Sequence, residues 1–186
     1  LTVSGTPSVQ QSSPFNPTSA YSTSVIGGSG YFDGSGDYLS VASNTALQLS
    51  SNNFTIECWF NLSTGGGNWS IIENVGAYAL YGDNNRWVLK INDVTNIFVS
   101  GWTPTMNTWY HVACVRNGAT IKIYINGIQL DSGASVNQNT GSQTNIGYSS
   151  YGGYTNCYIS NLRIVNGTAV YTSNFTPPTS PLTAIT

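Results

Sequence analysis

The chain has 186 residues, only 6% of them are charged, and the formal net charge at pH 7 is −2. Nucleic-acid binding needs a basic patch that neutralises phosphates, whereas the five basic residues here stand singly, which argues against that class. No apolar run approaches the ~20 residues of a membrane-spanning helix, so membrane insertion is not expected either. Aromatic and β-branched residues recur throughout, which indicates a folded chain of about one domain.

Residues 1–28 are rich in Ser, Thr, Pro and Gly, a composition typical of a linker or of an extended arm that pairs at a sheet edge. Strand signals begin near residue 30, and residues 172–186 return to a Pro-containing, linker-like composition. The sequence therefore predicts one domain over residues 29–171 between two flanking segments. The strands are predicted at 31–32, 38–41, 54–60, 69–75, 77–81, 87–91, 96–99, 109–116, 119–125, 128–130, 143–147 and 158–165.

Two hairpin signals mark the middle of the chain. Asn117-Gly118 and Asn126-Gly127 tolerate the positive φ angles of two-residue turns, and each pair lies between apolar, alternating runs. The isoleucines of residues 119–125 share one face, and Lys122 and Tyr124 share the other, which is the pattern of a half-buried strand. We therefore predict a three-stranded antiparallel meander from residue 109 to residue 130.

No window of helical length survives the density of Gly, Asn, Ser, Thr and β-branched residues. Many short strands at spacings of roughly 8–12 residues are typical of two stacked sheets. The predicted fold class is all-β, a two-sheet antiparallel jelly-roll sandwich.

Several segments also resemble one family. They are FDGSGDYL at 32–39, FTIECWF at 54–60, WYHVA at 109–113 followed by IYING at 123–127, and ISNLRI at 159–164. Together they resemble the laminin-G-like, concanavalin A-like jelly roll over residues 30–171. The closing stretch, residues 158–171 continued by 175–178, is similar to modules of aquatic bacteriophage structural proteins and bacterial surface proteins. That resemblance implies a module that stands in tandem arrays or oligomers, on a virion or on an extracellular or cell surface.

Glycoside hydrolysis needs two carboxyl groups that flank the scissile bond. Glu57 and Glu73 are the only glutamates, and neither lies in the Glu-x-Asp-x-x-Glu pattern of glycosidases on related jelly rolls. The only histidine, His111, corresponds to a packing and hydrogen-bonding residue of the resembled family. We therefore predict that the chain is not an enzyme. Cys58 and Cys114 lie in strand-like runs, where a free cysteine is typically a small buried hydrophobe.

Binding residues are expected in loops on a rigid scaffold. Residues 147–154 have the Tyr, Ser and Gly composition of an adaptable recognition loop, in which tyrosine rings can stack on a sugar. The alternative is a solvated loop or a subunit contact. The predicted ligand-binding residues are Tyr148, Tyr151, Tyr154, Trp102, Asp83, Asn84 and Asn85.

Asp33 and Asp37 flank a Gly-containing turn and are candidate ligands of Ca²⁺, with a simple Asx-type turn as the alternative. No other cofactor is expected. The sequence leads to a non-catalytic adhesion module that binds glycans through loops at the ends of its sheets. The rival hypothesis is a purely structural virion decoration or fibre domain whose partners are neighbouring subunits.

Overall fold

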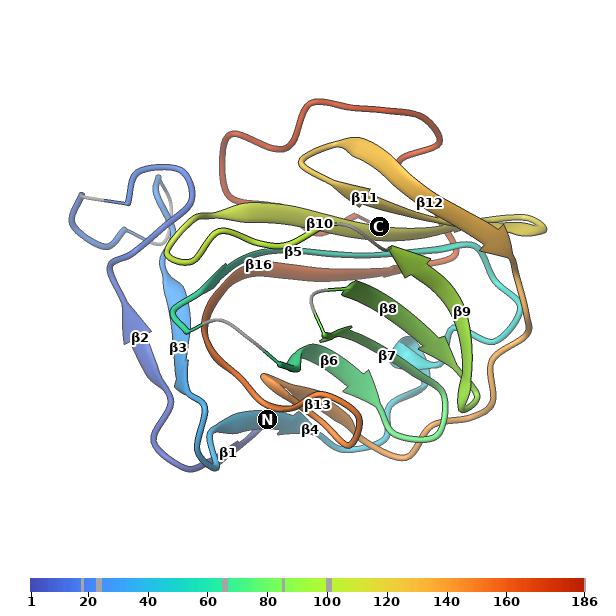
Figure 1. Ribbon diagram of the computed structural model, residues 1–186, viewed down its shortest axis with the longest axis horizontal. Helices are drawn as coiled ribbons and strands as arrows, with labels where there is room; N and C mark the ends of the chain where they lie inside the picture. Colours follow the sequence, from blue (N-terminus) through green and yellow to red (C-terminus); the bar gives the residue numbers. More distant parts are fainter. Residues whose placement is uncertain (18, 23–24, 65–66, 85, 100–101, 186) are drawn as a thin grey trace.

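The computed structural model of the chain describes residues 1–17, 19–22, 25–64, 67–84, 86–99 and 102–185. Over these ranges two seven-stranded antiparallel sheets stack on one another (Figure 1). A separate two-stranded hairpin is also present. One turn of 3₁₀ helix, η1 (Thr45–Leu47), is also present. The predicted all-β, two-sheet jelly-roll sandwich is confirmed. No helix in the described part of the chain is long and apolar enough to cross a membrane.

The spatial order of the strands within each sheet differs from their order along the chain. In spatial order, sheet I consists of β1 (Thr2–Ser4), β4 (Tyr38–Val41), β13 (Thr144–Ile146), β6 (Trp69–Asn74), β7 (Tyr78–Asp83), β8 (Arg86–Ile91) and β9 (Val94–Val99). Sheet II consists of β12 (Ile128–Ala134), β11 (Thr120–Ile125), β10 (Tyr110–Asn117), β5 (Phe54–Leu62), β16 (Asn156–Asn166), β3 (Ser29–Asp33) and β2 (Ser8–Gln10). The separate hairpin consists of β14 (Tyr148–Ser149) and β15 (Gly153–Tyr154).

The meander of β10, β11 and β12 forms as predicted, but one of its turns is shifted by one residue. Ile125 pairs with Ile128, so Asn126 and Gly127 are the two turn residues, with φ of 49° and 77°. In the first hairpin Asn117 pairs with Thr120, which leaves Gly118 and Ala119 in the turn. Gly118 has φ of 58°, as a turn with glycine at its first central position requires. Asn117 is therefore the last residue of β10 and not a turn residue.

The main core fills the space between the two sheets, where the alternating side chains of both inner faces meet. Aromatic rings are prominent in it: Phe60 and Trp69 each contact Trp87 edge-to-face, with centroid separations of 4.9 and 5.9 Å. Trp87 is fully buried. The three cysteines are all free and buried, which confirms the prediction for Cys58 and Cys114.

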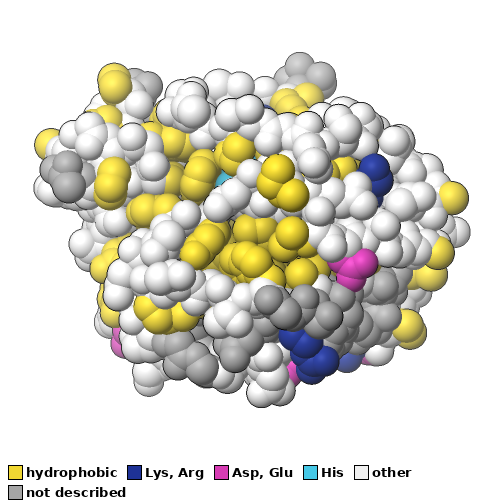
Figure 2. Space-filling model, turned by 45° about the horizontal axis from the view of Figure 1, so that its top comes forward, with side chains coloured by type: hydrophobic (Ala, Val, Ile, Leu, Met, Phe, Trp, Pro, Cys, Tyr) yellow, Lys and Arg dark blue, Asp and Glu magenta, His cyan; other side chains and the backbone are white. Residues whose placement is uncertain are grey.

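A second, smaller core lies on the outer face of sheet II, where solvent was expected. Tyr124 has 0% exposure because the C-terminal segment crosses over it, and Phe175 meets its ring at 5.4 Å. The half-buried character predicted for residues 119–125 is therefore wrong on the Tyr124 side. Alternation within one strand carries no information about a distant segment that folds back onto it. Figure 2 shows hydrophobic side chains gathered across the face on which this segment lies.

The flanking segments also contact the sheets. β1 pairs with β4 at one edge of sheet I, and β2 pairs with β3 at the corresponding edge of sheet II. In the C-terminal segment the Phe175 N–H donates to the Gly127 carbonyl at 2.9 Å. The division into a domain over residues 29–171 and two flanking segments stays a prediction.

Candidate functional site

Three tyrosine rings gather where the hairpin of β14 and β15 meets β4. Tyr148 and Tyr154 are paired across the hairpin, and their ring centroids lie 4.6 Å apart. Tyr38 completes the group at 5.4 Å from Tyr148 and 6.2 Å from Tyr154. Tyr154 is 42% exposed, so this ring presents an open face to solvent that the other two rings support.

A cleft of about 510 Å³ opens beside Tyr154, and we call it the Tyr154 cleft. Strand register assembles it, because Asn156 at the start of β16 pairs with Asp33 at the end of β3. The Ser63 N–H donates to the Asn156 carbonyl at 3.0 Å, which brings the loop between β5 and β6 to the same place. The lining residues are Asp33, Gly34, Thr64, Asn68, Trp69, Tyr154, Thr155 and Asn156.

The hairpin that carries Tyr154 is held firmly against β6. The Ser70 N–H donates to Thr155 Oγ1 at 2.5 Å, and Thr155 Oγ1 donates back to the Ser70 carbonyl at 2.9 Å. Ser149 Oγ lies 2.8 Å from Ser70 Oγ and accepts from the Gly152 N–H at 2.9 Å. Because buried polar groups are paired here, the tyrosine ring sits on a fixed support.

Two polar side chains of the cleft, Asp33 and Asn156, are each oriented by one hydrogen bond and keep capacity for a ligand. Asp33 Oδ1 accepts from the Ser35 N–H at 2.7 Å, and Asn156 Oδ1 accepts from the Tyr31 hydroxyl at 3.3 Å. Among the described residues, neither Asp33 Oδ2 nor Asn156 Nδ2 makes a hydrogen bond. A carboxylate oxygen and an amide N–H beside an exposed ring are groups that suit the hydroxyls and the apolar face of a sugar.

Trp69 forms the inner wall of the cleft and lies flat against Gly82 of the neighbouring β7. A Cβ at Gly82 would lie 2.0 Å from Trp69 Cε2. We therefore expect Gly82→Ala to displace the indole and to lower the free energy of unfolding by about 1–3 kcal/mol. Urea denaturation measures this, with Gly30→Ala as the control, since a Cβ there meets nothing closer than 3.4 Å. Equal stability of both variants would show that Trp69 does not pack on Gly82.

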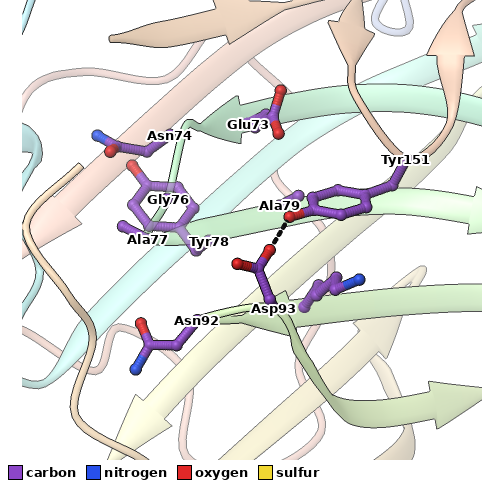
Figure 3. Close-up of a pocket in the computed structure, with 10 residues that line it drawn as sticks. Glu73, Asn74, Gly76, Ala77, Tyr78, Ala79, Asn92, Asp93 and Tyr151 are labelled. Atoms are coloured by element: carbon purple, nitrogen blue, oxygen red, sulfur yellow. Dashed lines mark hydrogen bonds between the residues drawn. The ribbon is translucent and has the colours of Figure 1, made fainter. Parts of the chain in front are cut away.

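Tyr151, on the same hairpin, faces a different pocket. Its ring stacks on Tyr81 at 5.5 Å, Lys90 Nζ lies 3.9 Å from its centroid, and its hydroxyl donates to Asp93 (Figure 3). Burial first, and then the bond to Asp93, raise the pKa of Tyr151 to about 12. This pocket is smaller than the Tyr154 cleft, and Glu73 also lines it.

The two glutamates are on different sheets and are engaged by protein groups. Glu73 on β6 accepts from the Ser150 hydroxyl at 2.6 Å and from the Ser150 N–H at 3.1 Å. Glu57 on β5 accepts from Arg163 at 2.5 Å and from Tyr171 at 2.8 Å, and it lies 3.1 Å from His111 Nε2. Burial raises the pKa of Glu57, but these hydrogen bonds and the Arg163 charge outweigh it and hold the pKa below its usual range.

The other ligand-binding residues predicted from the sequence do not lie together in the structure. Trp102 is partly buried against Tyr110 and Trp87, with centroids at 5.2 and 6.1 Å, and does not line the Tyr154 cleft. Asp83 pairs with Arg86 at 3.1 Å. The Asn84 N–H donates to Asn68 Oδ1 at 3.3 Å, at the rim of the cleft. Asn85 lies outside the described residues.

The turn of the two candidate calcium ligands is held by backbone donors. Asp37 is 2% exposed and accepts from the Thr6 N–H at 2.5 Å and from the Asp33 N–H at 3.2 Å. Asp33 accepts from Ser35 two residues on, which is the Asx-type geometry that the sequence left open. In the described part of the chain, no three His, Cys, Asp or Glu residues group as a metal site would. Calcium binding by Asp33 and Asp37 stays a prediction.

Sequence reasoning missed most of the cleft. Asn156 reaches the cleft through the pairing of β16 with β3 and β5. Trp69 begins β6 and Asn68 directly precedes it, next to Ser70, which hydrogen-bonds to Thr155. The sequence did contain a signal for Asn156, which lies directly after the tyrosine-rich loop and before a predicted strand. Because strand ends on one side of a sandwich gather in space, Asn156 could have been included among the predicted ligand-binding residues.

Comparisons with known proteins agree with the fold. No curated protein matches the chain in sequence. Domain 4 of AbnA, a GH43 extracellular arabinanase from Geobacillus stearothermophilus solved with arabinotriose, has a TM-score of 0.64 and 17% identity, covering 90% of this chain and 85% of that one. A putative carbohydrate binding protein from Bacteroides ovatus has a TM-score of 0.56 and 17% identity, covering 73% of this chain and 42% of that one.

A structure of botulinum neurotoxin type C, whose cell entry depends on interaction with two ganglioside molecules, has a TM-score of 0.64 and 16% identity. The match covers 91% of this chain and 43% of the neurotoxin chain. This chain therefore spans less than half the length of the neurotoxin chain and of the Bacteroides ovatus protein. A family model described as the concanavalin A-like lectin/glucanases superfamily, Laminin G 3, matches residues 33–176. The chain therefore belongs to the Laminin G 3 family of the concanavalin A-like lectin/glucanases superfamily.

Proposed function

We propose that this protein is a non-catalytic module that binds glycans in the Tyr154 cleft. The observation that carries the proposal is the combination of an exposed tyrosine ring with the amides and carboxylate of Asn68, Asn156 and Asp33 in one cleft. Sugars are recognised by this pairing of an apolar ring face with convergent hydrogen-bonding groups.

Two further observations support a binding role and not a hydrolytic one. Domain 4 of AbnA was solved with arabinotriose, and the Bacteroides ovatus neighbour is described as a putative carbohydrate binding protein. Hydrolysis needs two carboxyl groups across one bond, whereas Glu57 and Glu73 belong to different sheets and hold protein donors.

We further propose that the module belongs to a virion or cell-surface structural protein and adheres to surface glycans outside the cell. The support is the similarity of residues 158–171 to modules of bacteriophage structural and bacterial surface proteins. A surface composed mostly of amides and hydroxyls suits exposure to changing salt concentrations, because few charges are there to be screened.

A second function, as a virion decoration or fibre domain that contacts other subunits, is favoured by one open edge of the sandwich. The edge strands β1 and β2 lie there with exposed apolar side chains: Leu1 is 82%, Val3 58% and Val9 72% exposed. These residues line an apolar groove of about 530 Å³. Unpaired edge strands are ready templates for a neighbouring chain.

Tyr154→Ala tests the proposed function, because it removes the open ring and leaves the hairpin backbone. We expect affinity for a glycan identified on an array to fall at least tenfold, about 1.4 kcal/mol, in isothermal titration calorimetry. Tyr151→Ala is the matched control, since that ring lies on the same hairpin and outside the cleft. Undiminished binding by Tyr154→Ala, or equal losses of affinity in both variants, would show that the glycan does not bind in the Tyr154 cleft.

A further inference from the structure

We infer that the Tyr154 cleft selects uncharged glycans and rejects glycans that carry carboxylate or sulfate groups. The inference rests on the proposed function and adds to it the class of ligand.

The cleft has a carboxylate and no cation. Asp33 is the only charged residue among those that line it in the described part of the chain, and the others offer hydroxyl, amide, aromatic or backbone groups. All five basic residues of the sequence lie within the described ranges, and none of them lines the cleft. An acidic sugar would meet a like charge there and find no partner for its own.

The basic residues each already contact another group of the protein. Their partners are Asp83 for Arg86, the Tyr151 ring for Lys90, the carbonyls of Ser50 and Val136 for Arg116, the Thr172 carbonyl for Lys122, and Glu57 for Arg163. Among the described residues, the lining of the cleft therefore lacks the arginine or lysine that recognition of carboxylate and sulfate groups uses.

Arg86 comes nearest to being an exception. It lies two positions after Asn84, whose N–H donates to the cleft residue Asn68, and its side chain is 38% exposed. Its guanidinium, however, donates to Asp83 Oδ2 at 3.1 Å and to the Asp83 carbonyl at 3.4 Å. The Asp83–Arg86 pair contributes no net charge at the rim, so the field in the cleft is set by Asp33.

Asp33 is placed to bind hydroxyl groups. Its Oδ1 accepts from the Ser35 N–H, which fixes the carboxylate, and its Oδ2 makes no hydrogen bond among the described residues. A fixed carboxylate accepts hydrogen bonds from sugar hydroxyls at little ordering cost. Asn156 and Asn68 supply the amide groups that pair with the remaining hydroxyl and ring oxygens of a neutral sugar.

The test uses the full 186-residue chain on an array in which each neutral oligosaccharide is printed beside its sialylated and sulfated forms. Titrations of the highest-ranking neutral glycan and of its acidic counterpart follow in EDTA, which keeps any Ca²⁺ away from Asp33. We expect the neutral form to bind at least tenfold more tightly. Its affinity should not change with NaCl concentration, whereas the residual affinity for the acidic form should rise as salt screens Asp33.

Asp33→Asn provides the second arm. We expect the ratio of neutral to acidic affinity to fall at least fivefold in this variant. Asp131→Asn is the matched control, because Asp131 also accepts a nearby backbone N–H, from Ser132 at 2.7 Å, and does not line the cleft. Its ratio should equal that of the wild type. The salt dependence of the wild type tests the same charge without any substitution.

The outcomes separate the two proposals. Acidic glycans that bind in EDTA as tightly as their neutral forms would overturn the inference and leave glycan binding in place. The inference would also be overturned if neither Asp33→Asn nor added salt changed the ratio of neutral to acidic affinity. Binding to no glycan on the array would instead reject the proposed function, and the charge selection with it.

Discussion

Arg163→Ala is expected to lower the free energy of unfolding by about 3–5 kcal/mol, because it leaves Glu57 buried without its charge partner. The Glu57 side chain has 0% exposure, and Arg163 Nη2 lies 2.5 Å from its Oε1. The same guanidinium also donates to the Thr183 carbonyl at 2.8 Å, so the substitution frees the C-terminal segment as well. Urea denaturation at neutral pH measures the change.

Arg86→Ala is the matched control. Arg86 and Asp83 are separated by 3.1 Å, but their side chains are 38% and 29% exposed. Exposed pairs contribute about 0–1 kcal/mol, so this variant should remain within that range of the wild type. If Arg163→Ala lost no more stability than Arg86→Ala, the buried Glu57–Arg163 pair would contribute no more than an exposed pair.

The Glu57 network also predicts how stability depends on pH. The pKa of Glu57 is lower in the folded protein, so its contribution is present above its unfolded pKa of about 4.3 and is lost as the pH falls through the folded value. The stability difference between the wild type and Glu57→Gln should therefore shrink from pH 7 toward pH 3. A difference that stays constant over this range would contradict a lowered pKa.

Phe175→Ala is expected to cost about 2–3 kcal/mol and to uncover the outer face of sheet II. The ring stacks on Tyr171 at 3.6 Å and meets His111 and Tyr124 edge-to-face at 5.7 and 5.4 Å. Its loss would hydrate the second core, because the C-terminal segment is the layer that covers those side chains. Chemical denaturation and hydrogen exchange at β11 measure the effect.

Ile185→Ala serves as the control in the same segment, since Ile185 is 42% exposed and should change stability by less than about 0.5 kcal/mol. Deletion of residues 172–186 should destabilise the protein more than Phe175→Ala, because it also removes the hydrogen bond from Phe175 N–H to Gly127. A deletion variant as stable as the wild type would mean that these residues are a linker with no part in folding.

The fold was predictable because local signals and the long-range structure agree. The Asn126-Gly127 turn and the isoleucines of β11 each specify the meander without any information from outside it. Gly118 shows the limit of such reasoning. Both Asn117-Gly118 and Gly118-Ala119 can form a two-residue turn, and pairing with Thr120 selects the second.

The candidate site was less predictable, because it is assembled by contacts between distant parts of the chain. Tyr154 could be chosen from its loop, whereas Asp33 enters the cleft only through its pairing with Asn156, 123 positions later. Tyr151 shares the same loop and composition, yet its ring turns to Lys90 and Asp93. Composition predicts a recognition loop, but it does not show which of the loop's rings face the same cleft.

Chemical-shift mapping with a neutral oligosaccharide identified on the array shows whether the ligand binds in the Tyr154 cleft. We expect the largest amide shifts at Gly34, Asn68, Tyr154 and Asn156, with the β10–β11 hairpin unchanged. Largest shifts along the open edge at β1 and β2, or across the outer face of sheet II, would contradict the account and place the ligand elsewhere on the sandwich.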